Sequence, residues 1–427
     1  MPFSKRQLAL AGGAVLFLAL IIGVPRFLPG LRAPFGPPPE DITALIPGDS
    51  DLQPVINETG MPLKLPPGFS ISIFAKDLPG ARVMRLDRFG NMWVSRTSEG
   101  AVTLLEIDRA TGKVAHQDDV FRDFRKPHGL AFDPEYGLIL YIAEEHQVRR
   151  FATYSEDPGE TVLELPDSGG GHFTRTIAFG PDGKLYVSVG SSCNVCRETE
   201  EQRAAILRYD PASAEATAGK PAAGQVEIFA RGLRNAVFFA WDYVSGKMWA
   251  TEMGRDLLGD DLPPDEINLI EAGKNYGWPI CYGKNIHDGD FDTNVYIRNP
   301  CEEPFETPSF IDVPAHSAPL GLAFIPPQSR WPEDYWHDLL VAYHGSWNRS
   351  EPTGYKVVRH KFDAQGNYQG VEDFITGWLA SSGASGLGQA PAALGRPVDI
   401  MALPDGFAYL SDDKAGVIYK IAWLDNP

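Results

Sequence analysis

The sequence predicts an all-β protein folded as a six-bladed β-propeller, and three observations support this class. A phrase of strand, turn and strand occurs six times, most clearly as AFGPDGKLYVSVG at 178–190. The 43 glycines and 36 prolines suit many tight turns better than long helices. Sustained helical periodicity is almost absent, and RETEEQRAAI (197–206) is the stretch most like a helix. Such repeats indicate a propeller, in which one loop per blade surrounds a central funnel.

The other copies of the phrase are looser and lie tens of residues apart. They occupy 85–96, 131–144, 240–254, 323–345 and 402–413. Two further strands are expected at 68–78 and 416–423, because apolar and polar residues alternate there. We expect these two strands to pair within one blade and close the ring, which removes exposed sheet edges.

The N-terminal part of the chain is expected to direct export. Lys5 and Arg6 precede an apolar run from Leu8 to Val24, at the short end of the range for a membrane span. No clear small-residue cleavage site follows, so an uncleaved inner-membrane anchor with a periplasmic body is favoured over a cleaved signal peptide. The predicted organisation is a signal or anchor segment at 1–32, a Pro-rich linker at 33–60 and the propeller at 61–427.

The charge balance argues against one class of partner. The chain has 38 Lys and Arg residues against 56 Asp and Glu residues, a net charge of −18. An acidic surface repels phosphate backbones, so we expect no binding of nucleic acid. Acidity also suits divalent cations, although solubility is the commoner reason for it.

The four cysteines suggest two disulfides, since an even number is typical of exported proteins. Proximity along the chain favours Cys193–Cys196 and Cys281–Cys301. One alternative is a redox motif at the C-x-x-C pair, which does not lie in a βαβ unit. A zinc site lacks a second C-x-x-C, and haem attachment would need a histidine where Arg197 stands.

Two candidate catalytic groups precede inner strands. His172 follows three glycines, which let a ligand approach the backbone, and histidine acts as a general base near neutral pH. Arg234 and Asn235 stand before another inner strand. Arginine offers a rigid fork for carboxylate or quinone oxygens, and asparagine offers a donor and an acceptor. The structural alternatives are a histidine that only hydrogen-bonds its loop and an arginine in a salt bridge between blades.

A carboxylate-rich loop is a candidate metal site. Its carboxylates are Glu252, Asp256, Asp260, Asp261, Asp265 and Glu266. Such oxygen-rich loops suit Ca²⁺, although the spacing is not that of an EF-hand. A solvated acidic loop is the alternative.

A second cluster comprises His344, Trp347, Asn348 and Arg349, between two strand-like segments. Tryptophan stacks on planar rings and arginine pairs with carboxylates. The alternative is an aromatic corner of a blade.

Three more residues occupy an equivalent position in their respective blades. His128, His316 and Arg396 each stand just before an inner strand, as His172 and Arg234 do. Because these positions converge on the propeller axis, all five are expected to lie around one funnel.

These motifs together resemble the sugar dehydrogenases that depend on pyrroloquinoline quinone (PQQ), the soluble glucose/sorbosone dehydrogenase family, and within it the sorbosone dehydrogenase branch. The segments that carry the resemblance are HGLAFDP, HFTRTIAFGPDGKLYVSVGSSCN, GLRN, GRDLLGDDLPPDEINLIEAGKNYGWP, HSAPLGLAF, HGSWNRSEPTGYKVV and RPVDIMALPDG. They run from about residue 65 to the end, and their order and spacing make the match specific. The resemblance implies a propeller with PQQ and Ca²⁺ as cofactors.

The resemblance also implies roles for the residues that bind the organic cofactor. His172 stands where the family's catalytic base stands, and it would take the hydroxyl proton while hydride passes to the quinone. Arg234 and Asn235 match the pair that binds the quinone oxygens. Arg396 matches one of two arginines that grip the PQQ carboxylates, and Val398 stands at the position of the second.

Further roles follow from the same resemblance. Arg349 is the expected replacement for a PQQ-binding lysine, and His128, His316 and Trp347 complete the expected cofactor-binding set. In the metal set, Gly254 and Arg255 match a Gly-Pro pair whose carbonyls hold the catalytic Ca²⁺, with arginine in place of proline. Glu266 and Tyr276 match a second, structural Ca²⁺ site.

The predicted function is therefore PQQ-dependent oxidation of an aldose or sorbosone-type sugar. A membrane quinone or cytochrome is the expected electron acceptor. One alternative is a propeller lactonase of the gluconolactonase type, although the inner-strand positions offer Arg and His where that class needs carboxylates and Asn. The other is a binding propeller that has lost PQQ, and Arg255 and Val398 keep it open.

Overall fold

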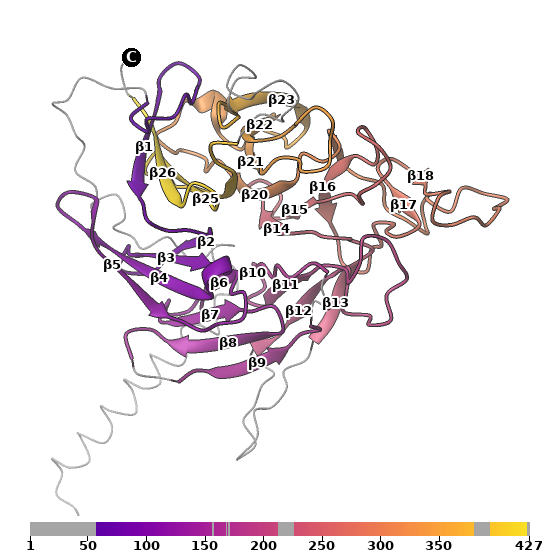
Figure 1. Cartoon of the computed structure of the whole chain (residues 1–427), viewed down its shortest axis with the longest axis horizontal. Coiled ribbons are helices and arrows are strands. Elements are labelled where there is room, and N and C mark those ends of the chain that lie inside the picture. The colour runs from indigo at the N-terminus through magenta and orange to yellow at the C-terminus, as the bar shows by residue number, and fades with distance from the viewer. Residues whose placement is uncertain are drawn as a thin grey trace, which may run out of the picture.

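The computed structural model describes residues 57–155, 158–167, 169, 171–211, 226–379 and 393–424. Six four-stranded antiparallel sheets are arranged around a common centre, which confirms the predicted six-bladed propeller (Figure 1). The predicted anchor at 1–32 and most of the linker at 33–60 lie outside the described residues. No helix among the described residues has the length and apolar character needed to cross a membrane.

The first three blades follow one another along the chain. Blade 1 consists of β2 (Ala81–Leu86), β3 (Met92–Arg96), β4 (Ala101–Asp108) and β5 (Lys113–Phe121). Blade 2 consists of β6 (Gly129–Phe132), β7 (Ile139–Ala143), β8 (Gln147–Ala152) and β9 (Glu160–Glu164). Blade 3 consists of β10 (Ile177–Phe179), β11 (Leu185–Val189), β12 (Ala205–Tyr209) and β13 (Val226–Arg231). The stretch 197–206 is not helical, and its end enters β12.

The other three blades complete the ring. Blade 4 consists of β14 (Phe238–Trp241), β15 (Met248–Glu252), β16 (Asp265–Ile270) and β19 (Ile311–Val313). Blade 5 consists of β20 (Pro319–Phe324), β21 (Leu339–Tyr343), β22 (Lys356–Phe362) and β23 (Tyr368–Ile375). Blade 6 consists of β24 (Pro397–Ala402), β25 (Phe407–Asp412), β26 (Val417–Trp423) and β1 (Phe69–Ala75). Short 3₁₀ turns lie at Thr97–Glu99 and Glu333–Tyr335.

Each copy of the repeated phrase forms the first hairpin of a blade, as predicted. The second strand of each hairpin is buried almost throughout, because neighbouring blades pack on both of its faces. An aspartate builds the turn in several copies. Asp87 and Asp242 accept backbone hydrogen bonds through Oδ1, and their Oδ2 atoms accept the indole N–H of Trp93 at 3.1 Å and Trp249 at 3.2 Å. The turn residue thus satisfies a buried donor on the following strand.

The ring is closed by strands from the two ends of the described propeller, which confirms that prediction. β1 pairs antiparallel with β26, and Phe69 stands opposite Trp423. Phe69 is fully buried, and its ring meets those of Trp331 and Trp423 edge-on at centroid distances of 4.8 and 4.9 Å. Both the hydrogen-bond ladder and apolar packing therefore hold the closing strand in place.

A lobe interrupts blade 4 between β16 and β19 and projects from the ring (Figure 1). It contains the small hairpin β17 (Cys281–Tyr282) and β18 (Ile286–His287). The Cys281–Cys301 disulfide closes this lobe, and the Cys193–Cys196 disulfide closes a short turn after β11. Both predicted disulfides are thereby confirmed.

Candidate functional site

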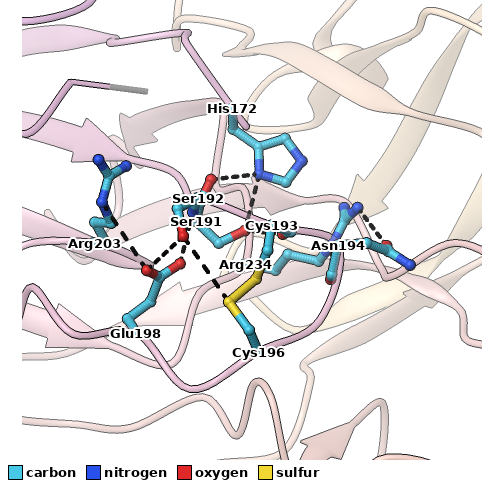
Figure 2. Close-up of a disulfide and its surroundings, with 9 residues drawn as sticks. All are labelled: His172, Ser191, Ser192, Cys193, Asn194, Cys196, Glu198, Arg203 and Arg234. Atoms are coloured by element: carbon cyan, nitrogen blue, oxygen red, sulfur yellow. Dashed lines mark hydrogen bonds and ion pairs between the residues drawn. A yellow bond between two sulfur atoms is a disulfide. The ribbon is translucent and has the colours of Figure 1, made fainter. Parts of the chain in front are cut away.

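His172 lies in the loop that leads into blade 3, and one of its ring nitrogens is fixed by Ser191 (Figure 2). His172 Nδ1 lies 3.1 Å from the Ser191 carbonyl oxygen and 2.9 Å from Ser191 Oγ. A carbonyl only accepts, and the Ser191 hydroxyl donates to the Cys193 carbonyl oxygen at 2.7 Å, so Nδ1 carries the proton. This tautomer leaves a lone pair on Nε2. Burial, and then the charge of Arg234, lowers the pKa of His172 to about 3, so the ring is neutral at pH 7.

Gly190, directly after β11, allows His172 and Asn235 to approach each other. A Cβ at position 190 would lie 2.5 Å from His172 Cβ and 2.8 Å from Asn235 Oδ1, which is closer than any ordinary contact. Asn235 is fixed from the other side, because its backbone N–H donates to Glu252 Oε1 at 2.9 Å. The missing side chain at position 190 therefore lets the candidate base and this amide share one corner of the site.

Arg234 is 6 % exposed at its side chain and is held by a set of acceptors. Its Nε donates to the Asn194 carbonyl oxygen at 2.9 Å, and its Nη2 donates to Asn194 Oδ1 at 2.9 Å and to Asp256 Oδ2 at 3.2 Å. Its Nη1 donates to the Met253 carbonyl oxygen at 3.1 Å. A guanidinium has five N–H groups. Contacts within the described residues occupy four of them, which leaves one N–H on Nη1 for a ligand.

Asp256 connects blades 3, 4 and 5 at this site. In addition to Arg234, it binds Asn348, whose Nδ2 donates to Asp256 Oδ1 at 2.7 Å. His316 Nδ1 lies 3.9 Å from the same oxygen, and His316 Nε2 donates to the carbonyl oxygen of Gly259 at 2.8 Å. The structure therefore brings together Arg234, His316 and Asn348, which the sequence analysis singled out in three separate motifs.

Three carboxylates are buried behind Gly254. Glu252 and Glu266 are cross-strand partners in β15 and β16. Asp265 accepts the backbone N–H groups of Gly254 at 2.9 Å and Ala318 at 2.8 Å. Burial raises the pKa of Asp265 and of Glu266 to about 7, and burial together with the Glu266 charge raises the pKa of Glu252 well above its ordinary value. Glu252 Oε2 is buried and has no hydrogen-bond partner within the described chain.

Two of these carboxylates, Glu252 and Glu266, line a cavity together with the predicted metal ligands. Its lining includes Glu252, Gly254, Arg255, Glu266 and Tyr276. Arg255 forms an ion pair with buried Asp288, in which Nη2 donates to Oδ1 at 3.0 Å and Nε lies 2.6 Å from Oδ2, so its charge is compensated. The Tyr276 hydroxyl donates to the Leu269 carbonyl oxygen at 2.6 Å, so that group is already engaged. An unpaired buried carboxylate oxygen among backbone carbonyls is a donor set that fits a hard cation such as Ca²⁺.

Arg396 belongs to a second polar cluster, which joins blades 5, 6 and 1. Its Nε donates to the His344 carbonyl oxygen at 3.1 Å, and its Nη2 donates to the Gly345 carbonyl oxygen. His344 Nε2 lies 2.9 Å from Asp413 Oδ1, and Arg82 Nη1 lies 2.7 Å from Asp413 Oδ2. Burial opposes ionisation of Asp413, but His344, Arg82 and Arg396 lower its pKa to about 2. The cluster holds the two guanidinium groups of Arg82 and Arg396 beside Asp413, and such groups suit an anionic ligand such as the carboxylates of PQQ.

The other predicted cofactor residues lie apart from these contacts. Arg349 is bound to the acidic loop through the Asp260 carbonyl oxygen and through Asp261, at 2.8 Å. Trp347 is 74 % exposed. His128 is 0 % exposed, and burial and then the charge of Arg82 lower its pKa well below the ordinary value; within the described residues no hydrogen bond or ion pair joins its ring to His172 or Arg396. Their roles toward a cofactor stay predictions.

The sequence analysis missed four residues that organise the site. Ser191 fixes the His172 tautomer, Asn194 holds Arg234, and Arg82 and Asp413 complete the second cluster. Asn194 lies between the two cysteines of the C-x-x-C pair, and that position was the available signal. Arg82 and Asp413 are far apart in sequence and meet only because blades 1 and 6 are neighbours, so no local pattern could have found them.

Comparison with protein families gives one match over most of the chain. The family model described as TrAA12-like matches residues 63–423. Among curated proteins, an uncharacterized protein from Borreliella burgdorferi is 29 % identical over 377 residues, which cover 84 % of this chain and 90 % of that protein. The pyrroloquinoline quinone-dependent pyranose dehydrogenase of Coprinopsis cinerea is 26 % identical over 413 residues, which cover 84 % of this chain. The chain spans about half of that relative, 54 % of its length.

Solved structures share the fold. The PQQ domain of the Coprinopsis cinerea pyranose dehydrogenase, in its holo form, has a TM-score of 0.67 and 21 % identity, with 86 % of this chain and 100 % of that chain covered. A calcium structure of the AA12 enzyme from Trichoderma reesei has a TM-score of 0.69 and 21 % identity, with 88 % and 99 % covered. At this identity the likeness establishes the propeller architecture.

Proposed function

Because the chain belongs to the TrAA12-like family, we propose that it oxidises an aldose or a sorbosone-type sugar by hydride transfer to PQQ, with Ca²⁺ assistance. The observation that carries this proposal is the state of His172. Its ring is neutral, its Nδ1 proton is held by Ser191, and its Nε2 is therefore a base next to the fixed guanidinium of Arg234. A base and an electrophilic donor held together are what oxidation of an alcohol requires.

Different residues of this chain carry out different parts of the proposed reaction. When bound, PQQ supplies the quinone that accepts a hydride, and with it two electrons, from the sugar carbon. His172 accepts the hydroxyl proton at Nε2, so that the C–O single bond becomes a carbonyl as the hydride leaves. Arg234 offers its remaining Nη1 N–H to a quinone oxygen, and the Asn235 amide lies beside it. These donors orient the acceptor and stabilise the negative charge that develops on it.

Two further groups of residues would hold the cofactors. Arg82 and Arg396 provide the positive charge for the PQQ carboxylates. The carbonyl oxygens of Gly254 and Arg255, with the buried carboxylate of Glu252, would hold Ca²⁺, which acts as a Lewis acid. We further propose a periplasmic location with an N-terminal membrane anchor and a membrane quinone or cytochrome as the electron acceptor. Fractionation of cells that express the full chain tests the location.

A cofactor titration tests the function. Purified protein is titrated with PQQ, with and without Ca²⁺, and PQQ absorbance is followed. Dye reduction is then measured with a panel of aldoses and sorbosone. We expect saturable PQQ binding and sugar-dependent dye reduction. His172→Ala should abolish turnover and leave PQQ binding largely intact. Absence of PQQ binding at micromolar cofactor, in the presence of Ca²⁺, would overturn the proposal.

A further inference from the structure

We infer that Asn194, held inside the Cys193–Cys196 disulfide turn, is the positioning residue that fixes the guanidinium of Arg234 in its reactive orientation. The significance for catalysis rests on the proposed function, in which Arg234 binds the quinone. The structural claim stands on contacts within the chain. Figure 2 shows Asn194 beside the Arg234 guanidinium, directly next to the disulfide.

Asn194 contacts Arg234 at two points. The backbone carbonyl oxygen of Asn194 accepts from Arg234 Nε, and Asn194 Oδ1 accepts from Nη2, both at 2.9 Å. Two acceptors on neighbouring nitrogens fix the plane of a guanidinium, whereas a single contact leaves it free to rotate. One residue therefore contributes half of the four contacts that hold Arg234.

Asn194 is itself fixed to the loop that supplies Asp256. The backbone N–H of Asp256 donates to Asn194 Oδ1 at 2.8 Å, and Asn194 Nδ2 donates to the Asp256 carbonyl oxygen at 3.0 Å. The orientation of the Asn194 amide is thereby specified, because the Asp256 N–H can only donate and the Asp256 carbonyl oxygen can only accept. Asn194 thus connects the turn after β11 to the backbone of Asp256, the residue whose carboxylate also holds Arg234.

The disulfide restricts the backbone that presents Asn194. Cys193 and Cys196 are three positions apart, so the bridge closes one tight turn around Asn194. The same turn reaches the candidate base, because the Cys193 carbonyl oxygen accepts the Ser191 hydroxyl that contacts His172. Opening the bridge increases the freedom of this backbone, and the contact from the Asn194 carbonyl oxygen is the first to lose its geometry.

The test measures the accessibility of Arg234 directly. Phenylglyoxal, which modifies guanidinium groups, is applied to the purified protein without cofactor, and the modification rate of each arginine is read by peptide mass spectrometry. Loss of a hydrogen bond to a charged group should raise the rate at Arg234 about tenfold in Asn194→Ala. Arg396, which has no contact with this turn, serves as the internal reference.

Three further variants separate positioning from folding. Asn194→Asp keeps the Oδ1 acceptor for Arg234 but loses the Nδ2 donor to the Asp256 carbonyl oxygen, so its rate should fall between those of Asn194→Ala and the unchanged protein. Cys193→Ser with Cys196→Ser should raise the Arg234 rate as Asn194→Ala does. Ser192→Ala lies next to this turn and removes hydroxyl contacts with Glu198 at 2.8 Å and with Cys196 Sγ at 3.9 Å but none with Arg234, so the Arg234 rate should not change. Equal Arg234 rates in Asn194→Ala and the unchanged protein overturn the inference.

The PQQ-loaded protein provides the functional readout. Asn194→Ala should lower kcat about tenfold with little change in the sugar KM, and Asn194→Asp, which keeps the acceptor for Arg234, should recover part of kcat. An unchanged kcat in Asn194→Ala, in a protein that does bind PQQ, overturns the catalytic significance. If the unchanged protein binds no PQQ, the proposed function fails, and the phenylglyoxal rates still decide whether Asn194 positions Arg234.

Discussion

His172 Nδ1 lies 3.1 Å from the carbonyl oxygen of Ser191, and this contact decides which nitrogen of the ring carries the proton. Because a backbone carbonyl has no proton to give, the ring is held as the Nδ1–H tautomer. Burial lowers the His172 pKa to about 3 at the same time. The ring is therefore neutral over the whole neutral range, as the base proposed for the reaction requires.

The pH dependence of the reaction should reflect this. With a pKa near 3, His172 stays neutral above about pH 4, so kcat/KM should be flat between pH 5 and 7 and lack an acidic limb near 6.5. Ser191→Ala keeps the carbonyl contact and should keep the flat profile. The measurement is dye reduction at subsaturating sugar. A limb with an apparent pKa near 6.5 would contradict the assignment of a pre-deprotonated base.

Asp256 should be more sensitive to substitution than its neighbours in the acidic loop. Asp256→Ala removes the acceptor shared by Arg234 and Asn348, and we expect about a 30-fold to 100-fold loss in kcat/KM, since charged hydrogen bonds contribute about 1.5–3 kcal/mol. Asp261→Ala, at an 84 % exposed carboxylate, is the matched control and should cost about twofold or less. Similar losses in both variants would mean that the loop acts only through its total charge.

Substitution of Glu252 should reduce the rise in Tm that Ca²⁺ causes. Because its Oε2 is buried without a partner in the described chain, and burial raises its pKa well above the ordinary value, a bound cation would stabilise the charged form of Glu252. Ca²⁺ should raise Tm, and EGTA should reverse the rise. Glu252→Gln keeps an oxygen for the Asn235 N–H but loses the charge, and its Ca²⁺ affinity should fall about tenfold or more. A full Ca²⁺ response in Glu252→Gln would place the ion elsewhere.

Acid should destabilise the fold through its buried histidines. Burial lowers the pKa of His360 to about 3, whereas the unfolded chain binds this proton near pH 6.5. Its contribution to stability is complete above pH 6.5 and is lost as the pH falls toward 3, at about 1.4 kcal/mol per pH unit. His360→Gln should reduce the slope of unfolding free energy against pH by that amount, as measured in urea between pH 6 and 4.5. His116→Gln, on exposed positions of β5, is the control, and equal slopes in both variants would refute the prediction.

The two disulfides should differ in what they stabilise. Cys281 and Cys301 are separated by 20 positions, and removing their bridge should cost about 3 kcal/mol of unfolding free energy by loop entropy. The Cys193–Cys196 bridge closes a far shorter loop, so its loss should cost less stability and more activity. Serine double variants, compared by urea unfolding and by dye reduction, check both parts. A reversed order would show that the short bridge is a folding element.

Much of the fold could be predicted because its signals are local. Each copy of the repeated phrase contains its own strands and its own turn, so the hairpins, the closing pair β1 and β26 and both disulfides followed from short stretches of sequence. The candidate base was found in the same way, because the His172 loop precedes the clearest copy. The most helix-like stretch, 197–206, forms no helix, and its last two residues belong to β12, which pairs with both of its neighbours.

The sequence by itself determined the blades and the positions just before their inner strands. Only the tertiary structure decided which of these positions share a site. Asp256 contacts Arg234, His316 and Asn348, and Asp413 contacts Arg82 and His344, because segments from different blades converge. His128 occupies an equivalent position in sequence and is nevertheless buried in the interior. The periodicity of the sequence predicts where a residue lies along its strand, but the packing of whole blades determines which other side chains it contacts.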